Sequence, residues 1–270
     1  MYKERVIAAV VPAHNEAAHI RDVISGLPAS VDFIVIVDDK SSDDTASLAE
    51  TSGDARVHVI RHEHNTGVGG AIITGHKRAL ELGSDVNVIF AGDDQMDPAY
   101  LPQLLDPIVD EGYGFTKANR FYSSTSFEGM PSYRVFGNVL LSFANKAASG
   151  YWNLFDPQNG YTATTAEVLR RLDLDAISQG YEFENDFLLH LNILNVKARD
   201  IPIPARYGSE VSGIKLHRVI PATGGMLIRS ARTRGSPPAD PPPHRATVRR
   251  TAKPRAAFAG AAPAPGSVLV

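Results

Sequence analysis

Apolar runs alternate with amphipathic segments along the first 110 residues of the chain. Runs of β-branched and small apolar residues cover residues 6–11, 33–37, 57–60 and 86–90. Such continuous runs are typical of strands buried on both faces of a sheet. The segments between them carry apolar positions at helical spacing, which predicts a helix after each strand. Four strand–helix repeats predict an α/β fold with a mostly parallel central sheet and helices on both faces.

The second half of the chain is less regular, but it contains further candidate elements. Residues 114–117 and 196–204 are interpreted as strands, and residues 152–165 as a strand and loop that line a pocket. Apolar positions between Phe183 and Leu194 recur at helical spacing, which predicts a strongly amphipathic helix.

From residue 231 the composition changes. The segment is rich in Pro, Ala and Arg and has almost no core-forming residues, which predicts disorder. Residues 229–270 hold eight Lys or Arg and one acid, whereas residues 1–228 hold 19 Lys or Arg and 29 acids. We therefore expect one domain over residues 1–230 and a disordered tail over residues 231–270. A tail that arose from a change of reading frame is an open alternative.

The composition excludes several classes of site. The chain has no cysteine, which excludes disulfides, thiolate metal sites and cysteine nucleophiles. No Gly-x-Ser-x-Gly elbow supports a serine hydrolase. No apolar run approaches the roughly 20 residues of a membrane helix, and the opening run is too short for a signal peptide. A cytoplasmic location is expected. The tail arginines lack interleaved aromatic residues, so no nucleic-acid partner is expected.

The most informative stretch is residues 88–98, in which an apolar run ends in three acids and an amide. Carboxylates this close repel one another and are tolerated best when they are solvated or bind a cation. Asp97, which a proline follows, has the pattern of a helix N-cap. For Asp93, Asp94 and Gln95 the alternatives are a solvated turn and a metal-assisted site for a phosphorylated substrate.

Polar residues also follow two other predicted strands. Pro12–Glu16 follows the first strand and Asp38–Asp39 the second. Ligands of open α/β sheets bind outside the carboxyl ends of strands, so these clusters and the acidic stretch are expected to converge on one edge. Asn15 is interpreted as the cap of the first helix. Asp39 either accepts hydrogen bonds from a base or ribose or caps the next turn.

A glycine loop, Asn65–Gly70, precedes the third predicted helix. It lacks the third glycine of a dinucleotide fingerprint and the Gly-Lys-Ser/Thr of a P-loop. Its backbone amides could approach an anion at the helix start, or the loop could be a tight turn for close packing; both interpretations stay open. His62 and His64 lack metal-ligand spacing on one element and are interpreted as surface residues.

Taken in order, these motifs resemble those of the GT-A-fold family 2 glycosyltransferases. The matching segments are Val11–Glu16, Val37–Thr45, Asn65–Gly67 and Gly92–Pro98, and the resemblance extends over residues 5–220. The branch that the chain resembles most is the dolichyl- or polyprenyl-phosphate mannose synthases. The resemblance implies a metal-dependent transfer of a hexose, mannose or glucose, from a nucleotide diphosphate sugar to a polyprenyl or dolichyl phosphate at a membrane surface, with inversion.

The resemblance also assigns roles to residues. In the family's Asp-x-Asp-x-Gln metal motif, this sequence has Ala91 at the first position, and Asp93 and Gln95 match the other two. Asp94 is a neighbouring carboxylate that could compensate for Ala91. The implied catalytic residues are Asp93, Arg120, Arg134 and Lys215, the implied nucleotide-binding residues are Pro12, Asn15, Glu16, Asp39, Gly67 and Asp94, and Glu184 matches a further recurrent position.

Elementary chemistry is consistent with these assignments. A nucleotide diphosphate leaving group gains negative charge as the anomeric bond breaks, and Mg²⁺ or Mn²⁺ on its phosphates neutralises that charge. A phosphate acceptor, with a second pKa near ~6, is already a nucleophile at neutral pH and needs no strong general base. Cations that hold it in line matter more, and Arg120, Arg134 and Lys215 are candidates. For Lys215, an ordinary surface role is an equal alternative.

Three further hypotheses stay open. The enzyme could act on a saccharide acceptor, or the chain could be a non-catalytic nucleotide-sugar-binding homologue, an idea that Ala91 motivates. A nucleotidyltransferase has a similar sheet and metal site, but it needs a glycine-rich phosphate loop after the first strand, and Pro12–Asn15 is not one. Peripheral attachment to the membrane is compatible with the lack of a predicted membrane helix.

Overall fold

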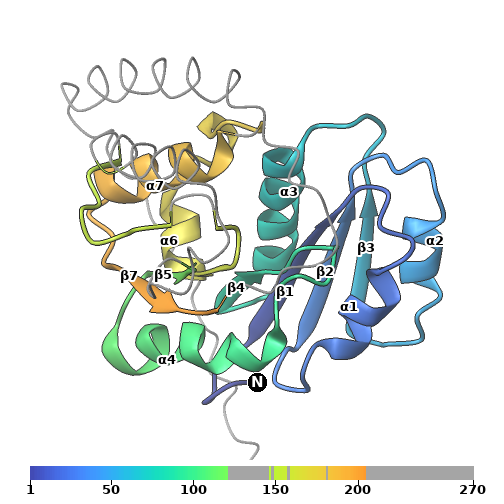
Figure 1. Cartoon of the computed structure of the whole chain (residues 1–270), viewed down its shortest axis with the longest axis horizontal. Coiled ribbons are helices and arrows are strands. Elements are labelled where there is room, and N and C mark those ends of the chain that lie inside the picture. Colours follow the sequence, from blue (N-terminus) through green and yellow to red (C-terminus); the bar gives the residue numbers. More distant parts are fainter. Residues whose placement is uncertain (121–145, 147–148, 157–158, 181, 205–270) are drawn as a thin grey trace, which may run out of the picture. The chain divides into compact units, whose positions relative to one another are not determined.

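The chain forms a seven-stranded sheet with helices on both faces, as the computed structural model shows (Figure 1). The structure describes residues 1–120, 146, 149–156, 159–180 and 182–204. In chain order the elements are β1 (Ile7–Ala13), α1 (Ile20–Gly26), β2 (Phe33–Asp38), α2 (Thr45–Glu50), β3 (Val57–Arg61), α3 (Val68–Glu81), β4 (Val86–Ile89), the short 3-10 helix η1 (Pro98–Tyr100), α4 (Leu101–Glu111), β5 (Phe115–Asn119), β6 (Thr162–Thr165), α6 (Ala166–Arg171), the 3-10 helix η3 (Leu174–Ala176), α7 (Phe183–Ile193) and β7 (Ala198–Pro202).

The strands lie in the order β3-β2-β1-β4-β6-β5-β7. β1 pairs in parallel with both β2 and β4, and β3 pairs in parallel with β2. β6 is antiparallel to both of its neighbours, β4 and β5, whereas β7 is parallel to β5. Every strand except β6 therefore points the same way, which confirms the predicted mostly parallel sheet. The carboxyl ends of β1, β2, β4 and β5 lie at one edge.

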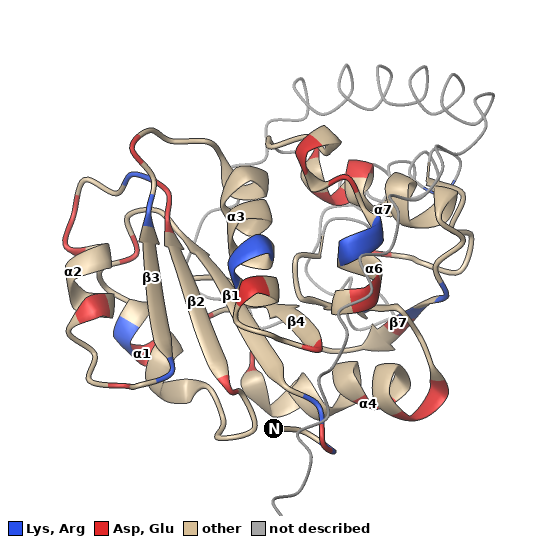
Figure 2. Ribbon diagram, turned by 180° about the vertical axis from the view of Figure 1, so that it is seen from behind, with Lys and Arg blue, Asp and Glu red and all other residues tan. Residues whose placement is uncertain are grey.

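The two faces of the sheet carry separate hydrophobic cores. Val11 of β1 packs with Ile20 of α1 and Leu104 of α4 on one face. Its neighbour Val10 packs with Ala71 of α3 on the other face, because successive side chains of a strand point to opposite sides. Helices α6 and α7 extend this second face with their own core around Phe115 of β5. The bodies of β1, β2 and β4 carry no charged residue before their ends (Figure 2).

The four strand–helix repeats predicted from the sequence are all present, but the start of the first helix differs. Asn15 does not cap α1, because α1 begins at Ile20 after His19. The backbone of Asn15 is left-handed, with a φ of 59°, and its side chain bonds to Ser42 instead. Asp97 does cap the short helix η1, where its Oδ1 accepts from the amide of Ala99 at 2.9 Å.

Several predicted features lie outside the described residues. They include Arg134, Lys215 and the tail over residues 231–270, so the domain boundary at residue 230 stays a prediction. Among the helices in the described part of the chain, none is both long enough and apolar enough to cross a membrane.

Gly75 of α3 lies close against the sheet, and we expect that it tolerates no side chain. A Cβ atom at this position would lie 2.3 Å from Cγ1 of Val10 and 3.4 Å from Cγ2 of Val37. Gly75→Ala is expected to lower the free energy of unfolding in urea by about 1–3 kcal/mol, because α3 must move away from β1. The control is Gly26→Ala, where nothing lies within 4 Å of the added atom. Equal stability of the two variants would contradict this packing argument.

Candidate active site

Unusual backbone conformations occur in the loops at the carboxyl ends of the parallel strands, which form the ligand edge of the sheet. Asn15 after β1, Lys40 after β2 and Asp94 after β4 have φ values of 59°, 63° and 59°. Residues other than glycine rarely adopt this left-handed conformation, which is strained unless the surroundings hold it in place. Such a residue therefore lies within the first and third polar clusters predicted from the sequence and directly after the second, Asp38–Asp39, and the clusters follow adjacent strands of the sheet.

Side-chain hydrogen bonds tie these loops together. The Oδ1 atom of Asn15 accepts from the amide of Ser42 at 2.8 Å, and the amide of Glu16 donates to Oγ1 of Thr45 at 2.8 Å. The acidic stretch approaches the same segment, because a Cβ at Gly92 would lie 3.1 Å from the carbonyl oxygen of Pro12. The structure thus brings Pro12 and Glu16 beside the start of the acidic stretch, and it ties Asn15 to the loop after β2.

Asp39 is the most heavily bonded residue of this edge. It is 3% exposed, and its two carboxylate oxygens accept from the amides of Thr66 and Gly67, from Oγ1 of Thr66 and from Nδ1 of His62, at 2.8–2.9 Å. Burial alone would raise the pKa of Asp39, but these hydrogen bonds outweigh burial and hold the pKa below its ordinary value. Asp39 thereby fixes the glycine loop that leads into α3.

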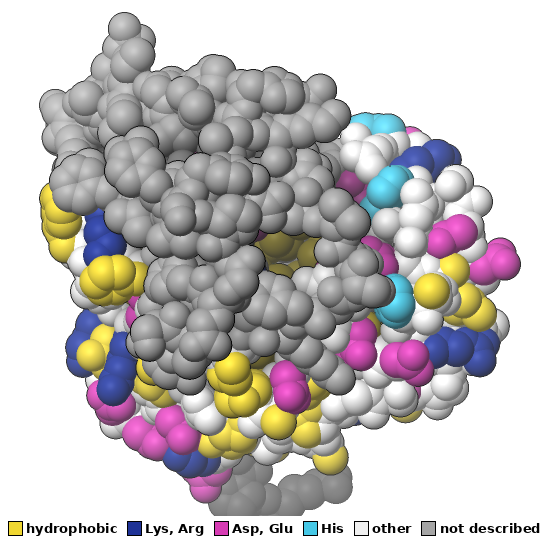
Figure 3. Space-filling view, viewed as in Figure 1, with side chains coloured by type: hydrophobic (Ala, Val, Ile, Leu, Met, Phe, Trp, Pro, Cys, Tyr) yellow, Lys and Arg dark blue, Asp and Glu magenta, His cyan; other side chains and the backbone are white. Residues whose placement is uncertain are grey.

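The histidines near this edge have different environments. His62 was interpreted as a surface residue, but its side chain is largely buried between Asp39 and Oγ1 of Thr74, which it meets at 3.0 Å. His14 is exposed, and its Nδ1 bonds to the carbonyl oxygen of Asp39 at 2.9 Å. Figure 3 shows histidine and acidic side chains near one another on the part of this face that carries β3 and α2.

The acidic stretch forms a compact turn after β4. Oδ1 of Asp93 accepts from the amide of Gln95 at 3.1 Å, and the amide of Ala91 donates to the sulfur of Met96 at 3.1 Å. Asp93 is half-buried and Gln95 is exposed. The turn therefore presents a carboxylate and an amide side by side, while Asp97 is engaged as a helix cap.

A pocket of about 520 Å³ opens beside this turn. Its lining combines Asp93 and Gln95 with Arg120 from the end of β5 and with the backbone segment 159–161. An arginine and two oxygen donors around one pocket suit a ligand with phosphate groups, because guanidinium binds phosphate directly and the oxygen donors suit a divalent cation. The remaining lining residues are Ala91, Met96, Asp97, Tyr100, Ala118, Ile203 and Pro204.

Arg120 is held by a buried carboxylate. Its Nε and Nη2 donate to the two oxygens of Asp156 at 2.7 and 3.1 Å, and its amide donates to Asp156 at 3.2 Å. Asp156 is 1% exposed. Burial would raise the pKa of Asp156, but the bonds and charge of Arg120 hold it below the ordinary value. The paired geometry fixes the direction in which Arg120 faces the pocket.

The donor set at the acidic turn fits a metal ion that brings other ligands with it. Among the described residues, no group of three or more His, Cys, Asp or Glu is arranged to hold a metal by itself. Asp93 and Gln95 offer two oxygen donors in the lining of the pocket. Mg²⁺ is commonly held by one or two carboxylates together with substrate phosphates and water, so two protein donors are compatible with such an ion.

The structure also reveals buried charges that the sequence pattern did not indicate. Lys117 of β5 is 1% exposed, and Asp200 of β7 is half-buried. The only local signal was a lysine within a strand whose neighbours Phe115 and Ala118 are apolar. Arg134 and Lys215, the other predicted cations, lie outside the described residues.

Comparisons with known proteins agree with this geometry. The family model described as glycosyl transferase family 2 matches residues 8–173. A UDP-N-acetylglucosamine–dolichyl-phosphate N-acetylglucosaminyltransferase of Methanococcus voltae is 30% identical over 219 residues, which are 76% of this chain and 87% of that protein. An undecaprenyl-phosphate mannosyltransferase of Micrococcus luteus is 31% identical over 202 residues, or 73% of this chain and 82% of the relative.

Solved structures share the fold. Glucosyl-3-phosphoglycerate synthase from Mycobacterium tuberculosis, in complex with UDP, superposes with a TM-score of 0.64 at 23% identity, over 87% of this chain and 82% of that one. Another structure of the same enzyme, with Mn²⁺, UDP and phosphoglyceric acid, gives a TM-score of 0.63. The sheet and its covering helices are those of GT-A glycosyltransferases, and the match to the family model covers more than half of the chain. The chain is therefore a glycosyltransferase and belongs to glycosyltransferase family 2.

Proposed function

We propose that the enzyme transfers a hexose from a nucleotide diphosphate sugar to a polyprenyl or dolichyl phosphate. The observation that carries the proposal is the single pocket that Asp93, Gln95 and Arg120 line together. Relatives of this chain are named for transfer to dolichyl and undecaprenyl phosphate. In the reaction, an oxygen of the acceptor phosphate forms a bond to the anomeric carbon. The bond from that carbon to the diphosphate breaks, and the nucleotide diphosphate leaves.

The donor side of the pocket is assigned to the acidic turn and the loops beside it. Asp93 and Gln95 would hold Mg²⁺ or Mn²⁺, which when bound neutralises the charge that develops on the diphosphate. Asp94, whose strained backbone is part of the turn, is a further candidate for the donor. Pro12, Asn15, Glu16 and Gly67 are the remaining candidate nucleotide contacts.

Asp39 supports the nucleotide site indirectly in this proposal. The residue is 3% exposed and already accepts four hydrogen bonds within the chain, three at Oδ1 and one at Oδ2, so it offers a base little open surface. Its contribution is then to fix Gly67 and, through its backbone carbonyl, the exposed side chains of His14 and Asn65, at 2.9 and 3.2 Å. Polar groups in fixed positions suit the recognition of a nucleoside.

The acceptor side is assigned to Arg120. A guanidinium bonded to Asp156 has a fixed orientation, so it can hold a phosphate in line with the anomeric carbon. Arg134 and Lys215 remain the other predicted phosphate contacts. A lipid-phosphate acceptor implies that the reaction takes place at a membrane surface.

The proposal is tested by a donor and acceptor screen. UDP- and GDP-linked glucose, mannose and N-acetylglucosamine are incubated with polyprenyl phosphate and Mg²⁺ or Mn²⁺, and released nucleotide diphosphate is measured. Release that depends on polyprenyl phosphate is expected. Release that requires 3-phosphoglycerate or a free saccharide would overturn the acceptor assignment. Nucleotide binding in calorimetry without turnover on any acceptor would favour a non-catalytic homologue.

Asp93→Asn is expected to remove metal-assisted catalysis without disturbing the fold. The amide keeps the size of the side chain but loses the charge that binds a divalent cation, so turnover should fall by about 100-fold or more, and metal should no longer enhance nucleotide binding. The matched control is Asp97→Asn, since Asn caps helices as well as Asp does. Equal losses in the two variants would mean that the general negative charge of the turn, rather than Asp93, matters.

Ala91→Asp is expected to strengthen metal binding. Ala91 lines the pocket next to Asp93 and Gln95, and an added carboxylate would supply a further hard ligand. The Mn²⁺ concentration for half-maximal activity should fall by about 3- to 10-fold, since affinity for such ions rises with the number of charged ligands. Ala91→Asn separates charge from size. An unchanged metal requirement in Ala91→Asp would show that position 91 does not face the ion.

A further inference from the structure

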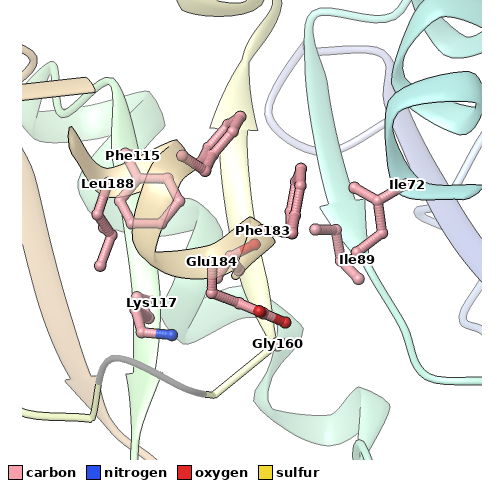
Figure 4. A pocket seen from close by; sticks show the side chains of 10 residues that line it. Ile72, Ile89, Phe115, Lys117, Gly160, Phe183, Glu184 and Leu188 are labelled. Atoms are coloured by element: carbon pink, nitrogen blue, oxygen red, sulfur yellow. The ribbon is translucent and has the colours of Figure 1, made fainter. Parts of the chain in front are cut away.

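A second, smaller cavity adjoins the pocket. Its volume is about 20 Å³, and Gly160 lines both the cavity and the pocket. Ile72, Ile89 and Phe183 form its apolar side. Figure 4 shows the side chains of Lys117 and Glu184 at its polar side. A lysine and a glutamate therefore line a cavity that shares Gly160 with the pocket.

Lys117 is an unusual residue for its position. It lies in the middle of β5, where it pairs with Thr162 of β6 on one side and with Asp200 of β7 on the other. Lysine is almost never buried this completely unless it is paired, because removing an ammonium ion from water is unfavourable. Its Nζ donates to the carbonyl oxygen of Asn159, the first residue of the 159–161 segment.

Three acids from different elements surround the ammonium group of Lys117. Asp156 belongs to the segment before β6, Glu184 to α7 and Asp200 to β7, and Arg120 is the second cation of the group. Arg120 bonds to Asp156 through two nitrogens. Lys117 is the cation that interacts electrostatically with both Glu184 and Asp200, and Lys146 is a second, weaker cation for Asp200.

Asp200 shows why this interaction matters. Its Oδ2 accepts from the amide of Phe155 at 2.7 Å and from Nδ2 of Asn119 at 3.0 Å, whereas its Oδ1 is buried without a hydrogen-bond partner. Burial raises the pKa of Asp200 to about 6 and lowers the pKa of Lys117 to about 8. Burial also raises the pKa of Glu184. Lys117 and Asp200 are thus both charged between about pH 6 and pH 8.

We propose that Lys117 is a positioning residue for the acceptor side of the pocket: its ammonium group fixes the 159–161 backbone and holds the charge of Asp200 in place. The identity of the acceptor in this inference rests on the proposed function. The contacts of Lys117 do not depend on it. Lys117 contacts no ligand itself. It acts through the carbonyl of Asn159 and through Asp200, which anchors Phe155 next to Asp156, the partner of Arg120.

Steady-state kinetics on Lys117→Met, Lys117→Gln and Lys117→Arg test the proposal. Both neutral variants are expected to raise the KM for polyprenyl phosphate by about tenfold while the KM for the donor stays within about twofold, because only the acceptor side loses its orientation. Lys117→Arg should restore part of the loss. The control is Lys197→Met, which removes a lysine that also donates to a backbone carbonyl, that of Glu111, at the other edge of the sheet.

The pH profile separates positioning from simple packing. Above about pH 8 the wild-type ammonium loses its proton, so kcat/KM for the acceptor should fall there. Neutral variants at position 117 should have no such alkaline limb, and Lys197→Met should keep it. An alkaline limb that is unchanged in Lys117→Met, or a loss shared equally between the two KM values, would overturn the proposal.

Hydrogen exchange gives a readout that needs no turnover. Peptides that cover residues 159–165 should exchange faster in Lys117→Met and Lys117→Gln than in wild type, while Lys117→Arg and Lys197→Met should resemble wild type. Unchanged exchange would overturn the positioning role even if the enzyme uses another acceptor. If wild type transfers nothing to a lipid phosphate but exchange changes as expected, the proposed function fails and the positioning role stands.

Discussion

The buried carboxylate of Asp39 is the interaction on which the ligand edge of this sheet depends. Its oxygens accept four hydrogen bonds from the segment between β3 and α3, and its backbone carbonyl bonds to His14 after β1 and to Asn65. One residue at the end of β2 therefore joins the loops that follow three adjacent strands. A parallel sheet brings such loops near one another, but only specific bonds give them a fixed relation.

The sequence predicted the regular half of the fold because its strands are continuous apolar runs that only a doubly covered sheet can bury. It also located the acidic turn at Asp93 and Gln95, because an apolar run that ends abruptly in acids indicates a buried strand followed by a solvent-accessible turn. The antiparallel insertion of β6 was not predictable in this way. Its residues, Thr162–Thr165, have no apolar run, and their place between β4 and β5 follows from tertiary pairing rather than local pattern.

Charged residues were the least predictable part of the site. A lysine in a sequence is normally interpreted as exposed, and nothing adjacent to Lys117 indicates that acids about 40 and 80 residues later, at Asp156 and Asp200, will surround it. Asn15 gives the opposite error: its residue type suited a helix cap, but its side chain bonds to the loop after β2. In both cases the role of the residue depends on partners far away in the sequence, and local periodicity does not indicate such partners.

The three left-handed residues at the ligand edge have a consequence for how this enzyme can change. Asn15, Lys40 and Asp94 each hold a left-handed backbone conformation, which costs about 1–2 kcal/mol for a residue such as lysine and less for Asn and Asp. Glycine at these positions would relieve that strain, but it would also free the loops that present the polar groups. At this edge, a substitution that raises thermal stability would therefore also reduce the order of the site. Adaptation to higher temperature would be easier in the two cores or on the outer helices, which can be improved without loosening the loops around the pocket.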